Sequence, residues 1–389
     1  MNKNPSDVDI VICGGGPIGL YLAGRLMQKG FSCRVLEKKI EIFQHSRSLG
    51  IHPVSMELFE RAGIAGRFLE SGLQIRRGIA FWNRDRLGEI SFDNCPKPFN
   101  YILALPQWQT ESILQDWVLS LDQNALIRGA EVITIEDLDQ SVTTTYKMEN
   151  GEQNTIHSRF LVGCDGFNSF VRKAMDIPFE GKPYPDSYIM GDFSDNTEFG
   201  TNAAVFLHEG GLIESFPLPN GLRRWVVKTD HRIQEPTPDL LIQLVFDRIG
   251  HKLSGSNCEM LSSFGVQHYL AQMMASGNIL LAGDAAHVVS PIGGQGMNLG
   301  WLDAEACSES ISRSFKEPQK QNSLFLLYSK KQRKVAKQVA KRAEMNMWLG
   351  RKESSKLPVK WAMAMILNTP LSGLLAKIFT MRGLGTWWI

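Results

Sequence analysis

The chain has 389 residues, of which 42 are basic and 40 acidic, and 43% of its residues are hydrophobic. The net charge of +2 gives no global attraction to nucleic acid, so no nucleic-acid partner is expected. Composition and length favour a folded protein of two packed domains. We expect a cytoplasmic protein without a transmembrane segment, because the start is polar and no apolar run reaches membrane-spanning length.

The six cysteines are spread along the chain without the paired spacing of a redox motif or a metal site. Cys13 and Cys33 lie in apolar, strand-like runs, where cysteine behaves as a small hydrophobic residue. We therefore expect reduced thiols and no bound metal.

The first forty residues have the pattern of a nucleotide-binding strand, turn and helix. Residues 9–13 form a continuous apolar run that predicts a buried strand, and helical spacing follows the turn. The turn carries Gly14, Gly16 and Gly19, which fit G-x-G-x-x-G and let the backbone approach a pyrophosphate. Glu37 closes the next strand about 20 residues later, where an acid can bind ribose hydroxyls. The pattern predicts a dinucleotide site without distinguishing FAD from NAD(P).

The segment that follows contains two predicted helices and a hairpin. Arg47 lies in a loop, where it is either solvated or a bidentate clamp for a pyrophosphate. The next helix is predicted to be capped by Ser55 and stopped by Gly63. A second helix has Gln107 at its head, and Asn150-Gly151 predicts a tight turn between two strands.

Two later stretches each place an acid directly after a strand. The first is Cys164-Asp165-Gly166, at the end of the hairpin. The second is the strand at 279–282, which runs into Asp284, then Pro291 and a glycine cluster at 293–296 that opens a helix. The acid can accept hydrogen bonds from hydroxyls, and the helix start offers free N–H groups at the positive end of its dipole. We therefore expect an oxygen-rich ligand here.

Residues 177–276 carry no glycine fingerprint and are rich in aromatic side chains, so we predict a sheet that forms one wall of a pocket. Thr237 and Pro238 predict the start of a helix that ends near Ile249. Residues 76–99 are expected to add a strand or two. The other predicted strands lie at 188–193, 203–208, 212–217 and 223–229.

The C-terminal part is predicted to be helical. Seven basic residues lie between Lys330 and Arg342 of a helix over 319–349. They are interpreted as a solvated face, with peripheral contact to an anionic membrane surface or an acidic partner as the alternative. Residues 357–389 are apolar and predict a helical pair, broken near Pro370, on the pocket side. Packing against the nucleotide domain alone is the alternative.

Together these stretches resemble the single-component FAD-dependent aromatic hydroxylases, the flavoprotein monooxygenases built like para-hydroxybenzoate hydroxylase. The resemblance covers about residues 8–345, and its motifs occur in the family's order. Gln107 with Glu111 and Leu114, and Tyr328 with Arg333, fit two further family helices. The four main matches are Gly14 to Glu37; Arg47 with Gly50; Cys164 to Gly166 with Ser169 and Arg172; and Gly283 to His287 with Pro291, Gly294, Gly296 and Asn298.

The resemblance implies an α/β fold, in which a Rossmann-like FAD-binding domain of the glutathione reductase type carries an interposed antiparallel β-sheet substrate domain and a C-terminal helical segment. The expected FAD-binding domain comprises 1–75, 100–176 and 277–318, the substrate domain 76–99 and 177–276, and the C-terminal helices 319–389.

The resemblance also implies which residues bind the cofactor, and it assigns no certain catalytic side chain. Pro291, Gly294, Gln295 and Gly296 would line the flavin ring, and His287 is expected to be structural or to lie beside the flavin. The residues that would bind FAD are Gly14, Gly16, Pro17, Ile18, Gly19, Glu37, Lys38, Arg47, Gln107, Asp165, Asp284, Pro291, Gly294, Gly296, Met297 and Asn298.

The implied reaction is hydroxylation of a flat aromatic or polycyclic small molecule with NADPH or NADH and O2, through a hydroperoxide on the flavin ring, as in secondary metabolism. The substrate, the choice of nicotinamide cofactor and the oligomeric state stay open. A flavin-dependent reductase or halogenase on the same fold is the main alternative, although the Trp-x-Trp-x-x-Pro stretch of such halogenases is absent. A non-catalytic nucleotide-binding escort protein is a further alternative.

Overall fold

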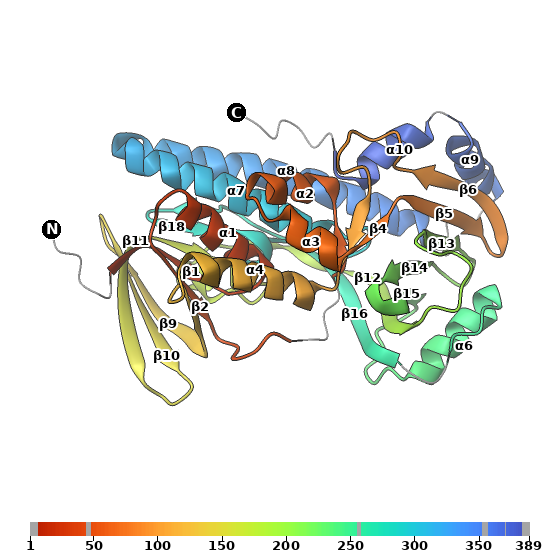
Figure 1. The fold of residues 1–389 in the computed structure, drawn as a ribbon, viewed down its shortest axis with the longest axis horizontal. Helices are drawn as coiled ribbons and strands as arrows, with labels where there is room; N and C mark the ends of the chain where they lie inside the picture. Colours follow the sequence, from red (N-terminus) through yellow and green to blue (C-terminus); the bar gives the residue numbers. More distant parts are fainter. Residues whose placement is uncertain (1–6, 44–47, 255–257, 352–356, 370, 383–389) are drawn as a thin grey trace.

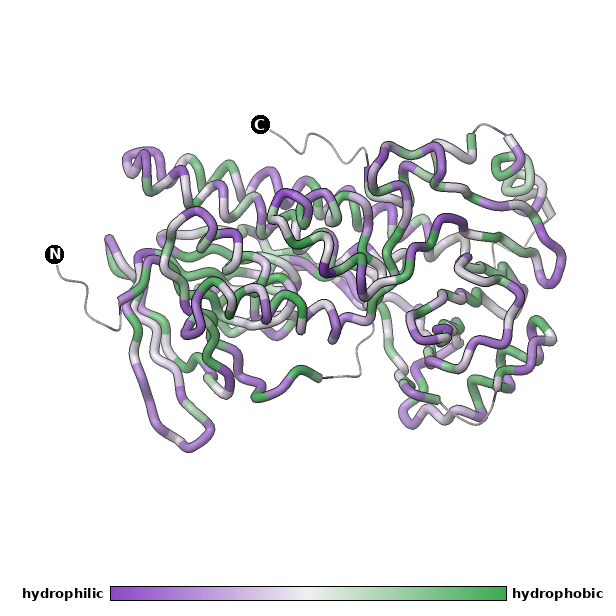
Figure 2. The backbone as a smooth tube through the Cα atoms, viewed as in Figure 1, coloured by the Kyte–Doolittle hydropathy of each residue, from purple (hydrophilic) through white to green (hydrophobic). Residues whose placement is uncertain are grey.

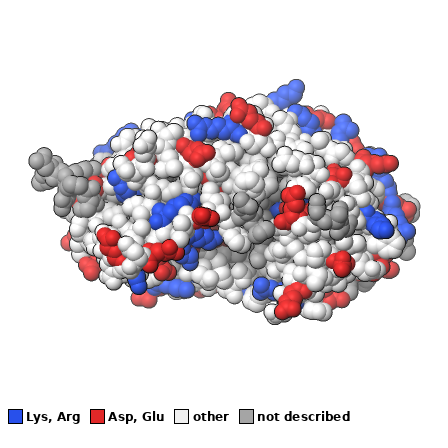
Figure 3. Space-filling model, turned by 60° about the horizontal axis from the view of Figure 1, so that its bottom comes forward, with Lys and Arg blue, Asp and Glu red and all other residues white. Residues whose placement is uncertain are grey.

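The computed structural model of the protein describes residues 7–43, 48–254, 258–351, 357–369 and 371–382. Within these ranges the chain forms two eight-stranded sheets and one three-stranded sheet. The molecule is elongated, with one large sheet toward each end (Figure 1). Arg47 and residues 383–389 lie outside the described ranges. On the face shown in Figure 3, basic and acidic side chains are interspersed, and neither sign covers it.

The first sheet has the N-terminal strand near its centre. β1 pairs in parallel with β2 on one side and with β11 on the other. Because parallel strands end at the same edge, the turns after β1, β11 and β18 meet there, as predicted for a Rossmann-like domain. In spatial order the strands are β17 (Ala275–Ser276), β18 (Ile279–Leu281), β11 (Gln153–Gly163), β1 (Asp7–Cys13), β2 (Cys33–Glu37) and β8 (Leu126–Arg128).

Long helices pack beside this sheet. Helix α1 packs against α4 and α7, and α8 lies along α7 (Figure 1). Small residues allow the close approach: a Cβ at Gly24 would overlap the Trp117 ring, and one at Gly300 would lie 2.6 Å from Ile18 Cδ1. The helices predicted to start at 107 and to span 319–349 are confirmed. Their bounds are α1 (Pro17–Gln28), α4 (Gln107–Leu121), α7 (Gln295–Lys316) and α8 (Gln321–Leu349).

An antiparallel meander extends the first sheet from β11. β10 (Val142–Met148) pairs with β11 and with β9 (Ala130–Asp137), and β9 contacts β2. The predicted turn at Asn150-Gly151 is confirmed, with Gly151 at a φ of 88°. Figure 2 shows hydrophilic residues along much of this projecting meander, whereas its base joins the apolar core of the sheet.

The second sheet is almost entirely antiparallel, and α6 (Pro238–Ile249) packs on one face of it. The predicted cap of α6 is confirmed, because the Thr237 hydroxyl accepts a hydrogen bond from Leu240 N. Only β13 and β5 pair in parallel within this order. The strands in spatial order are β19 (His287–Val288), β16 (Cys258–Ala271), β12 (Phe179–Ser194), β15 (Leu222–Thr229), β14 (Ile213–Leu218), β13 (Ala203–Leu207), β5 (Arg77–Trp82) and β6 (Asp85–Ser91).

The strands of this second sheet differ in one respect from the sequence prediction. β16, the long strand that pairs with β12 along most of its length, was not predicted. β17 of the first sheet and β19 of the second also cross the predicted domain boundaries, so the division into domains remains a prediction.

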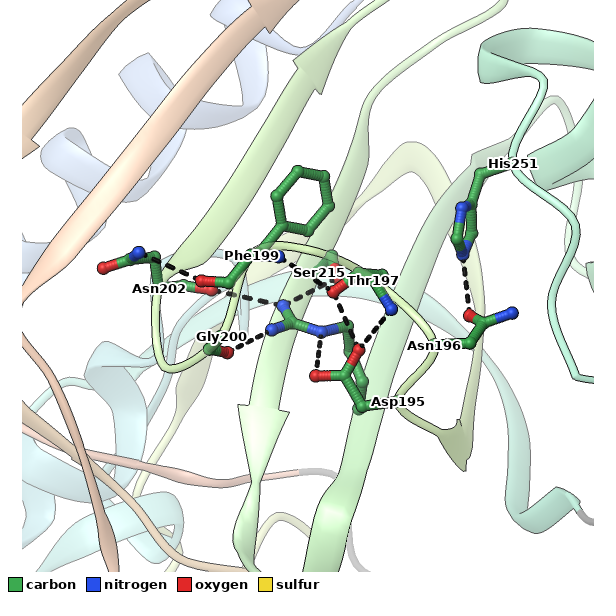
Figure 4. A network of polar contacts seen from close by, with 9 residues as sticks. Asp195, Asn196, Thr197, Phe199, Gly200, Asn202, Ser215 and His251 are labelled. Carbon is green, nitrogen blue, oxygen red and sulfur yellow. Dashed lines mark hydrogen bonds and ion pairs between the residues drawn. The ribbon is translucent and has the colours of Figure 1, made fainter.

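A buried arginine fixes the loop between β12 and β13 to the side of the second sheet that faces α6. The Arg223 guanidinium donates to the carboxylate of Asp195 at 2.9 Å, to the Gly200 carbonyl at 2.6 Å and to the Ser215 hydroxyl at 3.2 Å. Figure 4 shows Asp195 and Gly200 of the loop, and Ser215 of β14, gathered around the guanidinium. Since Arg223 has no accessible surface, its charge stabilises the loop and is not available to a ligand.

Short elements link the two large sheets. The predicted cap of the first of these helices is wrong: α2 begins at Pro53 with His52 as its N-cap residue, and Ser55 lies inside the first turn. Gly63 has a φ of 73° just beyond the helix end, as its predicted role as a stop requires. The remaining elements are β3 (Gly50–Ile51), α2 (Pro53–Arg61), α3 (Ala65–Ser71), β4 (Leu73–Ile75), β7 (Ile102–Ala104), α5 (Phe170–Ala174) and the short turns η1 (Pro219–Gly221), η2 (Gly283–Ala285) and η3 (Pro318–Lys320).

The C-terminal segment forms the predicted helical pair, α9 (Leu357–Leu367) and α10 (Ser372–Phe379), and both helices contact β6. Asn368 donates to the Leu87 carbonyl at 3.0 Å, which fixes the end of α9 to the second sheet. The predicted break at Pro370 falls at a residue outside the described ranges. Across the described ranges, we find no helix with the length and apolar character needed to cross a membrane.

Candidate functional site

A cavity of about 1230 Å³ runs from the edge of the first sheet to one face of the second sheet. Its walls come from the turns after β1, β2 and β11, from the start of α7, and from residues of α9 and α10. A single small ligand needs a pocket of roughly 300–1,000 Å³. This cavity therefore has room for more than one bound molecule.

The turn after β1 brings two of the predicted motifs into contact. Gly14 has a φ of 106°, and a Cβ there would overlap the carbonyl oxygen of Cys164. At Gly16 the space is open, because a Cβ would meet no atom of the described residues within 4 Å. Gly16 is also the N-cap residue of α1 and supplies no side-chain cap, so the first N–H groups of the helix face the cavity without that partner.

Glu37 lies across the same turn. Its carboxylate accepts a hydrogen bond from Gly15 N at 2.6 Å and one from Lys39 N at 2.9 Å. These two bonds hold the side chain at the cavity wall beside Lys38. Gly19 lies behind the turn, where a Cβ would overlap the Gly14 carbonyl, so this glycine serves the close packing of α1 on β1.

Asp284 follows β18 and has no hydrogen-bond partner within the described part of the chain. Its side chain is accessible from the cavity, yet protein encloses the site. Desolvation therefore raises the pKa of Asp284, and Asp303 adds a smaller contribution in the same direction. A carboxylate in this position can accept hydrogen bonds from the hydroxyls of a ligand.

A buried pair behind Asp284 supports the loop. Asp303 accepts hydrogen bonds from Gly283 N at 3.1 Å and from His287 Nε2. Burial alone would lower the pKa of His287, but the charge of Asp303 holds it above its usual value. His287 does not line the cavity and is almost fully buried, which fits the structural role expected for it.

Asp165 connects the turn after β11 to the cavity. One carboxylate oxygen accepts a hydrogen bond from Val171 N at 3.1 Å, near the start of α5. The other oxygen is buried and has no partner among the residues that the structure describes. Asp165 thus presents an unused acceptor beside Gly14.

The start of α7 forms the opposite wall. Gly293 and Gly294 have φ values of 89° and 64°, and a Cβ at Gly294 would lie 3.4 Å from His52 Nε2. Gly294 is the N-cap residue and supplies no side-chain cap, so α7 presents backbone N–H groups at Gly296 and Met297. Both of these residues line the cavity.

Asn298 was predicted to bind the cofactor together with Gly294 and Gly296, but unlike them it does not line the cavity. Its Oδ1 accepts from His52 N at 2.8 Å and from the Ser55 hydroxyl at 2.7 Å, and its Nδ2 donates to the carbonyls of Gly50 and Gly294, each at 2.8 Å. All its polar capacity is therefore used within the protein. Asn298 fixes the start of α7 to β3 and α2.

Most of the predicted cofactor residues meet in this one cavity, although their contacts with a cofactor remain predictions. Gln107 lines it while donating to Glu111 at 2.7 Å. Gly19, Gln295 and Asn298 lie behind the wall, and Arg47 lies outside the described residues. The predicted residues that line the cavity are Gly14, Gly16, Pro17, Ile18, Glu37, Lys38, Gln107, Asp165, Asp284, Pro291, Gly294, Gly296 and Met297.

Three polar residues of the site were not predicted from the sequence. His52 lines the cavity beside α7, and burial lowers its pKa to about 4. Asp303 lies just beyond the fourth motif in the sequence and had no predicted role. Glu214 lies on the second sheet and reaches the same cavity. Their positions follow from tertiary contacts, so no local pattern identified them.

Comparisons with known proteins identify the family of the chain. Residues 7–343 match a family described as an FAD binding domain. The chain is 34% identical over 302 residues to the uncharacterized aromatic compound monooxygenase YhjG of Bacillus subtilis, covering 76% of this chain and 60% of that protein. It is 32% identical over 303 residues to a rifampicin monooxygenase of Streptomyces venezuelae, covering 76% and 62% of the two chains.

A solved structure is similar along nearly the whole chain. OxyS anhydrotetracycline hydroxylase from Streptomyces rimosus superposes with a TM-score of 0.79 at 27% identity, covering 96% of this chain and 76% of that one. The chain spans about 60% of the length of the two curated relatives above. The family match, the identity to these relatives and the fold together place the chain in the FAD-binding family of flavoprotein monooxygenases that are built like para-hydroxybenzoate hydroxylase.

Proposed function

We propose that the protein is an FAD-dependent monooxygenase that uses NADPH or NADH and O2 to hydroxylate a flat aromatic or polycyclic small molecule. The observation that carries this proposal is the single cavity, which joins the dinucleotide motifs to an apolar sheet face. Relatives named for action on rifampicin and anhydrotetracycline support a large, flat substrate.

The residues of the cavity fit FAD in shape and in chemistry. The open space at Gly16 and the uncapped start of α1 suit a pyrophosphate. Glu37 is held where a ribose would bind, and Asp284, which has no partner within the described ranges, suits the hydroxyls of a ribityl chain. The backbone N–H groups at the start of α7 suit the polar edge of a flavin ring.

Bound FAD would supply the redox chemistry, accepting a hydride from the nicotinamide cofactor and passing electrons to O2. The protein contributes position and electrostatics. The uncapped N-terminus of the 22-residue helix α7 stabilises negative charge at the wall formed by Gly294 and Gly296. The close packing of Gly293 and Gly294 keeps side chains away from that wall.

The second sheet contributes the substrate side of the cavity. Its face toward the cavity is mostly apolar, with Val205, Leu212, Val226 and Phe264 among its residues. Burial of an aromatic ring against such a face contributes roughly 25 cal/mol per Å² of apolar surface. The same face excludes water from the reacting centre.

The decisive experiment follows labelled oxygen. Purified protein loaded with FAD is incubated with NADPH or NADH, labelled O2 and a panel of phenols and polycyclic aromatic compounds. We expect substrate-stimulated oxidation of the nicotinamide cofactor and one labelled oxygen atom in the product. Cofactor oxidation that yields only hydrogen peroxide across the whole panel would favour the flavin-dependent reductase. Protein that retains no flavin, judged by absorbance near 450 nm (an approximate value for oxidised flavin), would favour the escort protein.

A further inference from the structure

The second sheet presents to the cavity a carboxylate that has no partner among the residues that the structure describes. In the register of the sheet, Glu214 of β14 lies opposite Val205 of β13 and Val226 of β15. All three side chains line the cavity. The two neighbours of Glu214 along β14 point to the opposite face of the sheet. Ile213 packs in the core beneath α6, and the Ser215 hydroxyl accepts a hydrogen bond from Arg223. Glu214 therefore stands on the apolar wall that faces the interior of the cavity.

The other charged residue on this wall is already neutralised. Arg224 donates to both carboxylate oxygens of Asp192, each at 2.7 Å, and both side chains are buried. A bidentate pair of this kind satisfies the guanidinium within the protein. Arg224 therefore does not balance the charge of Glu214.

Glu214 itself has no hydrogen bond and no ion pair with any residue that the structure describes, although only 8% of its surface is accessible. Its neighbour Tyr188 is fully buried, and the Tyr188 hydroxyl also has no partner in the described ranges. Burial alone raises the pKa of Glu214 to about 7. An unpaired buried carboxyl destabilises the folded protein, so its presence on a binding wall points to a ligand that completes it.

We propose that Glu214 is a specificity-determining residue that accepts a hydrogen bond from a hydroxyl or N–H group of the aromatic substrate. The same carboxylate repels substrates that carry a carboxylate at that end of the ring system. The apolar residues around Glu214 contact the flat body of the substrate, and Glu214 selects its orientation. This inference rests on the proposed function for the identity of the ligand as a substrate, but binding itself does not require turnover.

The test compares three matched ligands by calorimetry on FAD-loaded protein, without nicotinamide cofactor. They are naphthol, its methyl ether and naphthoate, which share one flat body and differ in the polar group. The variant Glu214→Met keeps the length of the side chain and removes the acceptor, and Glu214→Gln keeps a neutral acceptor. Glu209→Gln is the control, because Glu209 is exposed on the loop between β13 and β14 and does not line the cavity.

We expect the wild-type protein to bind naphthol about tenfold more tightly than the methyl ether, as one charge-assisted hydrogen bond implies. Glu214→Met should abolish this preference and bind naphthoate more tightly than the wild type does. Glu214→Gln should retain part of the preference for naphthol, and Glu209→Gln should retain all of it. The inference is overturned if the wild type binds both uncharged ligands equally, if it binds neither, or if Glu214→Met keeps the preference. A retained preference without any labelled product would instead count against the proposed monooxygenase activity alone.

Discussion

Replacing Glu214 by glutamine should change how the stability of the protein depends on pH. In the folded protein burial raises the pKa of Glu214 from its usual value of 4.5 to about 7, and in the unfolded chain the carboxyl is solvated. Below about pH 4.5 the carboxyl is protonated in both states, so the folded protein keeps its full stability. As the pH rises, the unfolded state releases its proton first, and stability is lost until the pH passes about 7.

The size of this effect follows from the shift. A displacement from 4.5 to about 7 corresponds to roughly 3 kcal/mol of free energy of unfolding. Glutamine cannot ionise, so Glu214→Gln should lack this loss, and the variant should become more stable than the wild type by up to roughly 3 kcal/mol above pH 7.

The assay is urea unfolding of FAD-saturated, substrate-free protein at several pH values between about 4.5 and 8.5. The quantity of interest is the difference between wild type and variant, because other titrating groups cancel in it. Glu209→Gln controls for the loss of one negative charge from the same hairpin. A wild-type-to-variant difference that stays constant across this pH range would refute the placement of Glu214 as a buried, unpaired carboxyl.

Further predictions concern the cofactor wall. Gly14→Ala should lose about 2–4 kcal/mol of stability, measured by thermal unfolding, because its Cβ would overlap Cys164 at a φ of 106°. Gly16→Ala should fold normally yet release FAD on dialysis. Equal stability of the two variants would contradict this account. Asp284→Ala should raise the Kd for FAD about tenfold in titrations of the apoprotein. The free energy of unfolding should not fall, since Asp284 has no partner within the described residues. An unchanged Kd would show that Asp284 does not bind the ribityl chain. Asn298→Ala should lower the free energy of unfolding by about 3 kcal/mol in urea, because three buried groups and one half-buried group lose their partner. A loss below about 1 kcal/mol would show that these bonds are replaceable.

The first sheet and its turns could be predicted because their signals are local. The apolar run of β1, the glycines after it and the acid at the end of β2 have fixed spacing, and that spacing follows from the geometry of one strand, turn and helix. The same holds for the turn at Gly151 and for the cap at Thr237. Each of these features depends on residues that are neighbours in the sequence.

The missed features depend on distant contacts. The residue type of Ser55 favours a helix cap. In the structure its hydroxyl instead donates a hydrogen bond to Asn298, which lies far along the chain. β16 lacks the regular alternation of a half-buried strand, and its pairing with β12 determines its structure. Glu214 stands between Ile213 and Ser215, a local pattern that does not show which face of the strand is internal. Only its register with Val205 and Val226 shows that this face is internal.

The short link between β18 and β19 has a mechanical consequence. β18 belongs to the first sheet and β19 to the second, and only residues 282–286 separate them. The loop that carries Asp284 is therefore anchored at both ends, once in each sheet. A rotation of one sheet against the other would therefore have to change the backbone conformation of these residues, which include Asp284. The position of Asp284 is thus tied through a few backbone bonds both to the sheet of the aromatic wall and to the sheet of the dinucleotide motifs.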